Sequence, residues 1–85
     1  MRAYILLHTK PGTSEEVIRA LKATREVEAV VMADSVFGRF DAVIVMEVAN
    51  LRALSEAIYQ VVEKNPNVTH TETAISLFEE PPKRV

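Results

Sequence analysis

Apolar residues alternate with other positions in four segments of the chain, and in two further segments they recur at helical spacing. The first alternating run covers residues 2–8, and both of its faces are largely apolar. One face carries Ala3, Ile5 and Leu7, and the other carries Tyr4, Leu6 and His8. This pattern predicts a central strand that is covered on both sides.

The other three alternating runs cover residues 27–36, 42–48 and 68–78. In the second strand, Ala29, Val31 and Ala33 are expected to share one face. The third strand is again apolar on both faces. A short link that contains Gly38 separates the second strand from the third, which favours a hairpin.

The two helical patterns have recognisable ends. Thr13 followed by Glu16 forms a capping-box pattern, which predicts a helix over residues 14–24. Asn50 is placed to cap a second helix, and Asn65 to end it in a left-handed conformation before Pro66. The stripe of the first helix consists of Val17, Ala20, Leu21 and Thr24. That of the second consists of Leu51, Leu54, Ile58 and Val61, and it is broadened by Ala57 and Val62.

The order of elements is strand, helix, strand, strand, helix, strand. Two such halves predict an α+β fold, a ferredoxin-like βαββαβ sandwich with a four-stranded antiparallel sheet and two helices on one face. The opposite face of the sheet has no cover within the chain, although the first and third strands are apolar on that side too. We therefore expect a homodimer that packs sheet against sheet.

Composition bounds the remaining possibilities. The chain has 85 residues, which suits one domain over residues 1–78 with a charged, proline-interrupted tail over residues 79–85. It contains no cysteine, so disulfides and thiol chemistry are excluded. The net charge of -2 and the scattered basic residues argue against nucleic-acid binding. No apolar run approaches the roughly 20 residues of a spanning helix, so we expect a cytoplasmic protein without a membrane partner.

Candidate catalytic groups are few. His8 and His70 fall on strands that are neighbours in the predicted fold, but a structural zinc site needs four ligands, so ordinary surface histidines are favoured. No serine lies in a strained elbow, and nothing in the sequence brings Glu47 and Glu72 to working distance. The two glycines are too few for a phosphate-binding loop. We expect no enzyme activity, metal or cofactor.

Two features remain as candidates for ligand binding. Asp41 stands at the mouth of the predicted hairpin, where its carboxylate can accept N–H groups of its own turn or hold the ammonium group of a ligand. The second feature is the ladder of Thr69, Thr71 and Thr73 on the last strand, whose simpler interpretation is β-branched filling of an edge strand.

These residues resemble a known family. The run Gly38-Arg39-Phe40-Asp41 followed by an apolar strand is similar to the Gly-x-x-Asp motif in the effector domain of the leucine-responsive/AsnC (Lrp/AsnC, feast/famine) transcriptional regulators. The closing run of residues 68–77 is similar to that domain's Val-x-x-Thr-x-Thr ending. The resemblance covers roughly residues 3–78 and includes no helix-turn-helix, so the chain resembles a stand-alone effector (RAM) module.

The resemblance implies a function and a set of site residues. Members of the family form dimers that assemble into rings, often octamers, and amino acids bind between dimers near the Gly-x-x-Asp turn. On that basis Gly38 would allow close approach of the ligand, Asp41 would face its amino group, and Thr71 and Thr73 would add polar contacts. Arg39, with Phe40, replaces residues common in the motif and is expected to affect ligand preference. Full-length Lrp/AsnC regulators are implied as possible partners in transcription regulation.

Two alternatives remain open at this stage. An ACT-like amino-acid-binding domain has the same element order and would bind its ligand near Lys10-Pro11-Gly12. A small enzyme of the dimeric ferredoxin-like-barrel type, such as a monooxygenase or isomerase, would need a pocket between helices and sheet with a group such as His70 directed into it.

Overall fold

The computed structural model describes residues 1–23 and 29–78. Its elements are, in chain order, β1 (Arg2–Thr9), α1 (Ser14–Ala23), β2 (Val30–Ser35), β3 (Ala42–Glu47), α2 (Leu51–Ile58), the π-helical turn η1 (Tyr59–Glu63) and β4 (Val68–Ile75). This is the predicted βαββαβ order, and the ferredoxin-like fold class is confirmed. The tail predicted over residues 79–85 lies outside the described residues.

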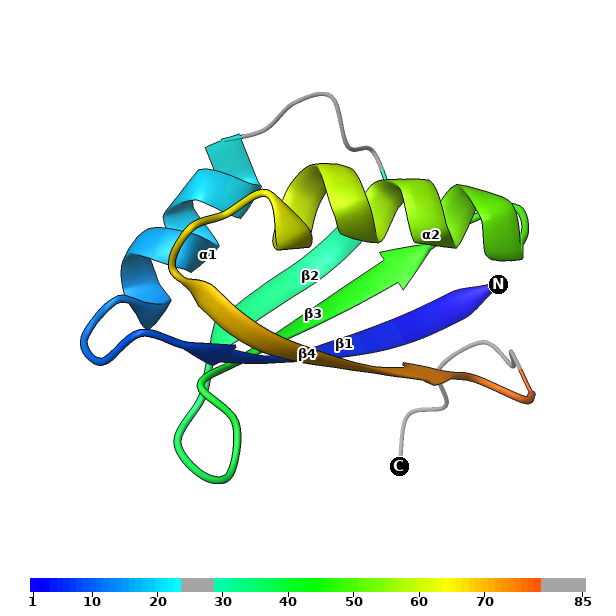
Figure 1. Cartoon of the computed structure of the whole chain (residues 1–85). Helices are drawn as coiled ribbons and strands as arrows, with labels where there is room; N and C mark the ends of the chain where they lie inside the picture. The colour runs from blue at the N-terminus through cyan, green and yellow to red at the C-terminus, as the bar shows by residue number, and fades with distance from the viewer. Residues whose placement is uncertain (24–28, 79–85) are drawn as a thin grey trace.

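The four strands form one antiparallel sheet in the order β2-β3-β1-β4. β1 lies in the middle, where Ile5 pairs with Ile44 of β3 on one side and with Thr73 of β4 on the other. Both helices cover the same face of the sheet, and the opposite face is uncovered (Figure 1). This arrangement makes β4 an edge strand, with one long side free of any partner strand in the described chain.

The core lies between the helices and the two central strands. On the face that the helices cover, Ala3, Ile5 and Leu7 of β1 and Ala42, Ile44 and Met46 of β3 are fully buried, and residues of both helices pack against them. The largest side chains with no exposure are Ile5, Leu7, Val17, Ile44, Met46, Leu54 and Val62. The described residues include no buried polar side chain, so apolar packing is the main stabilising term of this small core.

β2 departs from its predicted alternation. The strand begins at Val30 rather than at Val27, which falls among residues 24–28 outside the description. A register shift between Val30 and Met32 leaves Val31 as an unpaired bulge residue, so Val31 is exposed while Ala33 is buried. The prediction that Val31 and Ala33 share one face is wrong, because the extra residue in the bulge reverses the alternation of faces along the strand.

α1 forms where it was predicted but begins differently. The Thr13 hydroxyl donates to the Lys10 carbonyl oxygen at 2.7 Å and so closes the preceding loop, in place of the expected capping box. Val17 and Leu21 are buried as predicted, whereas Ala20 is exposed and Ile18 takes its place in the core. Ile18 belongs to the buried core cluster together with Val17 and Leu21.

α2 begins at the predicted cap, because Asn50 Oδ1 accepts a hydrogen bond of 2.8 Å from the Ala53 N–H. After Ile58 the helix widens into the π-turn η1, which keeps Val62 in the core; the Val61 side chain lies outside the description. The expected left-handed cap at Asn65 is wrong. The Asn65 side chain instead accepts a hydrogen bond from the Asn67 N–H at 2.9 Å, which forms a local turn.

Candidate functional site

Asp41 connects the predicted ligand turn to the central strand β1 through two hydrogen bonds. Its N–H donates to the Leu7 carbonyl oxygen at 2.8 Å, and its carboxylate Oδ2 accepts from the Thr9 N–H at 2.8 Å. The ladder between β1 and β3 ends at the pair of Leu7 and Ala42, so the carboxylate supplies an acceptor just beyond it. Asp41 therefore binds a backbone N–H 32 residues away rather than one in its own turn.

The rest of the turn projects from the sheet. Gly38 has φ of +150°, a conformation that L side chains rarely adopt. Phe37, next to it, has a relative exposure of 107%. The Arg39 guanidinium lies 5.7 Å from the ring centre of Phe40, and the Phe40 ring lies 4.8 Å from that of His8. The turn thus carries a free aromatic tip, a cation and a half-buried carboxylate within five residues.

Thr71 and Thr73 lie elsewhere. Both are on the helix side of β4, because their register partners Leu7 and Ile5 point into the core. They line a groove between β4 and the α2–η1 segment, and Gly38, Arg39 and Asp41 do not line it. Within one chain, the structure brings together the three turn residues and, separately, the two threonines.

The groove has a volume of about 620 Å³, within the usual range for ligand pockets. Its apolar walls come from Leu51, Leu54, Ile58 and Ile75. Ser55, Tyr59 and Glu63 line it as well, and the sequence analysis did not single them out. They recur every four residues beside the apolar stripe of the second helix, which is the signal that could have identified them.

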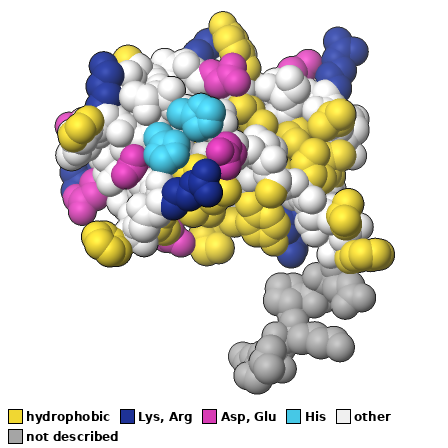
Figure 2. Space-filling view, turned by 60° about the horizontal axis from the view of Figure 1, so that its bottom comes forward, with side chains coloured by type: hydrophobic (Ala, Val, Ile, Leu, Met, Phe, Trp, Pro, Cys, Tyr) yellow, Lys and Arg dark blue, Asp and Glu magenta, His cyan; other side chains and the backbone are white. Residues whose placement is uncertain are grey.

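The uncovered face of the sheet is largely apolar. The apolar side chains that the register places on it are Tyr4, Leu6, Met32, Val43, Val45 and Ala74, here called the open patch, and the carboxylates of Asp34 and Glu72 lie on the same face. His8 and His70 are cross-strand partners at one end of this face, with ring centres 5.8 Å apart (Figure 2). The predicted proximity of the two histidines is confirmed, while among residues 1–23 and 29–78 no group of three or more ligating side chains is placed to hold a metal.

At the other end of the open face, Arg2 pairs with Glu47 at 2.8 Å. The hydrogen bond that the Arg2 guanidinium donates to the Glu47 carboxylate raises the pKa of Arg2, which stays charged at the rim of the open patch. The pair forms a charged edge beside the apolar surface.

His70, the histidine named for the enzyme alternative, is not directed into the groove between helix and sheet. The groove between helix and sheet is lined by Thr71 and Thr73, and His70 lies on the opposite face of the same strand. No helix among the described residues is long and apolar enough to cross a membrane.

The fold is that of a ferredoxin-like domain, and comparison with known proteins identifies its family. The model of the Lrp/AsnC ligand binding domain matches residues 2–84, so the chain belongs to that family. A comparison with curated proteins gave no match.

Three solved structures illustrate the similarity. FFRP-DM1 is 30% identical with a TM-score of 0.79, over 89% of this chain and 97% of that chain. AsnC of E. coli is 16% identical with a TM-score of 0.85, over 99% of this chain and 55% of that chain. A transcriptional regulator of Neisseria meningitidis in complex with L-Met is 16% identical with a TM-score of 0.77, over 95% and 52% of the two chains. The last two share the fold, and this chain spans about half of their length.

Proposed function

We propose that this protein is an amino-acid-binding effector and assembly module, which acts without catalysing a reaction and without binding DNA itself. The observation that carries the proposal is the match of the Lrp/AsnC ligand-binding domain over residues 2–84. It is supported by a structural neighbour, a transcriptional regulator that was solved in complex with the amino acid L-Met.

The turn of residues 38–41 is the proposed place for the ligand. A free amino acid is a zwitterion, and this turn presents both complementary charges, the Arg39 guanidinium and the Asp41 carboxylate. Gly38 carries no side chain and lets a ligand approach the backbone. The hydrogen bond from Thr9 fixes the Asp41 carboxylate, so little conformational entropy is lost when it binds an ammonium group.

The open patch is the proposed dimer surface. Met32 is 54% exposed and Tyr4 is 37% exposed, although both lie on a sheet rather than on a loop. A second copy packed sheet against sheet would remove this area from water at about 25 cal/mol per Å² of apolar surface. Because the dimer surface and the turn are different parts of the molecule, dimers would remain free to assemble further or to join full-length Lrp/AsnC regulators.

A thermal-shift screen against the twenty amino acids tests the ligand proposal. A true ligand at about 100 times its Kd stabilises the folded state by roughly 2.7 kcal/mol, so at least one amino acid should raise Tm by several degrees. The same concentration of that amino acid should stabilise Asp41→Asn by only about 1.4 kcal/mol or less, because a Kd raised tenfold or more leaves it at no more than about ten times the Kd of the variant. If no amino acid at millimolar concentration changes Tm, the proposed ligand class is wrong.

A further inference from the structure

His8 and His70 meet on the open face of the sheet. They are cross-strand partners of β1 and β4, and their ring centres are 5.8 Å apart. Figure 2 shows the two rings side by side at the surface, with acidic side chains next to them. We propose that this pair chelates a divalent transition-metal ion such as Zn²⁺ or Ni²⁺. Such a chelate differs from a structural zinc site with four protein ligands, because solvent fills the remaining positions.

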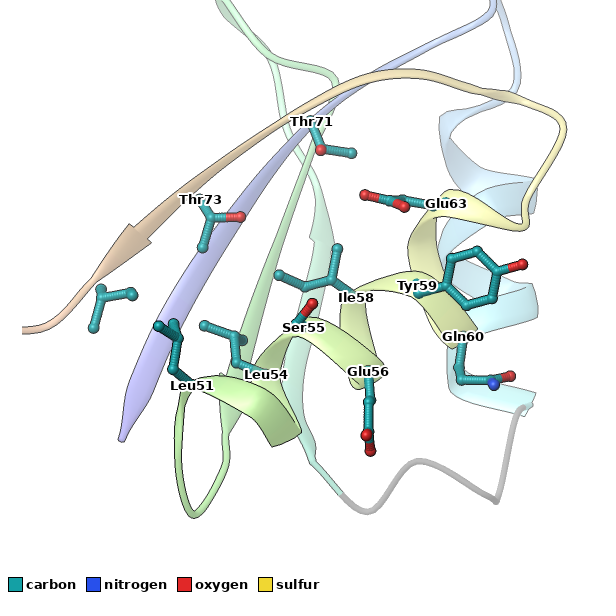
Figure 3. Close-up of a pocket in the computed structure, with 11 residues that line it drawn as sticks. Leu51, Leu54, Ser55, Glu56, Ile58, Tyr59, Gln60, Glu63, Thr71 and Thr73 are labelled. Atoms are coloured by element: carbon teal, nitrogen blue, oxygen red, sulfur yellow. The ribbon is translucent and has the colours of Figure 1, made fainter.

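The alternation of side chains along β4 sets the direction of the second ring. Thr71 and Thr73 point toward α2 in Figure 3. His70 and Glu72 alternate with them along the strand and therefore lie on the open side, where His70 pairs with His8. Paired strands hold opposite side chains close together, so the two imidazoles are neighbours before any ion binds.

The separation of the rings suits a single metal ion. An imidazole nitrogen binds zinc at about 2.0–2.1 Å, so two imidazoles on one tetrahedral ion have their ring centres roughly 5–6 Å apart. The distance of 5.8 Å between the ring centres of His8 and His70 lies in that range. The His70 side chain is 60% exposed, so its ring has room to adjust to an ion.

The ring nitrogens of both histidines are available to an ion. Among residues 1–23 and 29–78, no side chain or backbone group forms a hydrogen bond with the imidazole of His8. In the same part of the chain, His70 Nε2 faces Glu72 Oε1 at 3.8 Å, which is beyond hydrogen-bond distance. A metal ion therefore displaces no hydrogen bond within these residues when it binds.

The surroundings of the pair favour a bound cation. The Glu72 carboxylate places a negative charge beside His70, and it can accept a hydrogen bond from a metal-bound water or from a ligating imidazole. On the other side, the Phe40 ring packs against His8 at 4.8 Å between ring centres and limits the rotation of the imidazole. Arg39 lies 5.7 Å from the centre of the same phenyl ring and contributes an opposing positive charge, which Glu72 offsets.

The donor atoms select the class of metal. Imidazole nitrogen suits Zn²⁺, Ni²⁺ and Cu²⁺, whereas Mg²⁺ and Ca²⁺ prefer oxygen ligands. Because the site has two protein ligands in place of four, we expect a micromolar Kd rather than the tighter binding of a structural site. The pair exists only while β1 and β4 are paired, so the ion should bind the folded chain preferentially and stabilise it.

Titration calorimetry of the untagged chain with zinc chloride and with nickel chloride tests the site. Even contacts behind a metal ligand change affinity by roughly 10–100-fold, so His8→Gln and His70→Gln, which each remove one ligand, should weaken binding by about 100-fold or more. Glu72→Gln should weaken binding by about tenfold. The matched control is Glu56→Gln, a carboxylate on α2 that lies on the other side of the sheet (Figure 3), and it should bind like wild type.

A thermal melt with nickel chloride gives a second readout. Nickel should raise the Tm of the wild-type chain, and at the same concentration it should raise that of His70→Gln much less. Magnesium chloride should leave the Tm of both unchanged. The site is wrong if neither Zn²⁺ nor Ni²⁺ binds below millimolar concentration, or if binding is unchanged in His70→Gln, whose exposed position makes a folding defect easy to separate by urea unfolding. Equal losses in Glu72→Gln and Glu56→Gln would remove the assigned role of Glu72.

Discussion

Replacing Asp41 separates its structural task from its proposed ligand contact. The carboxylate accepts the Thr9 N–H at 2.8 Å in a partly buried position at the end of β1. A hydrogen bond to a charged group contributes about 1.5–3 kcal/mol, so Asp41→Ala should lower the free energy of unfolding by about 2 kcal/mol. Asp41→Asn keeps an oxygen acceptor at the same position, so it should lower it by about 1 kcal/mol or less.

The two variants should differ in their loss of stability but weaken ligand binding to a similar degree. Both variants remove the negative charge that is proposed to hold the ammonium group, so both should weaken amino-acid binding by a factor of ten or more. Urea unfolding measures the first quantity, and titration calorimetry with the amino acid found in the thermal-shift screen measures the second. Asp34→Asn, an exposed carboxylate on β2, is the control and should change neither.

One result would refute this reasoning. If folded Asp41→Asn binds the amino acid as tightly as wild type, the carboxylate serves only to hold Thr9 and the ligand contact lies elsewhere. If Asp41→Asn loses as much stability as Asp41→Ala, the charge of the acceptor is what the Thr9 hydrogen bond requires, and the magnitude assigned here to an uncharged acceptor is wrong.

Three further substitutions have definite expected outcomes. Gly38→Val should weaken ligand binding and cost about 1–3 kcal/mol of stability through backbone strain alone, because a Cβ there meets no atom within 4 Å; Gly38→Ala should show a smaller loss in the same urea assay. Asn50→Ala removes the acceptor of the Ala53 N–H and should cost about 1 kcal/mol, which calorimetric melting resolves. Leu6→Lys should give a folded monomer by light scattering, since Glu72 pairs opposite it and can neutralise the ammonium, while burial of that charge in a dimer costs several kcal/mol.

The fold follows from patterns that are local in the sequence. The doubly apolar strands β1 and β3, the Asn50 cap and the order of elements are all readable from residue spacing, and each is confirmed. The bulge at Val31 and the π-turn η1 are not readable in this way. Each inserts one residue into a regular element, and the reason lies in packing against neighbours distant in the sequence.

The candidate site was predictable in its parts but not in its layout. Residue types alone suggest that Asp41 is held by backbone N–H groups, but the partner, Thr9, is fixed by strand pairing rather than by the turn. The side of the sheet on which Thr71 and Thr73 lie depends on the register with β1. A shift of one residue in that register would place them on the open face instead. The sequence alone therefore could not show that Thr71 and Thr73 line a groove together with residues of α2 and η1.

The measurement that tests the central claim most directly is light scattering of the wild-type protein as the selected amino acid is titrated. If this chain is a ligand-responsive assembly module, the mean molar mass should change with a midpoint equal to the calorimetric Kd, and the midpoint for Asp41→Asn should lie at a tenfold or higher concentration. A mass that stays constant across the titration, while calorimetry reports binding, would contradict the account, because binding would then be uncoupled from assembly.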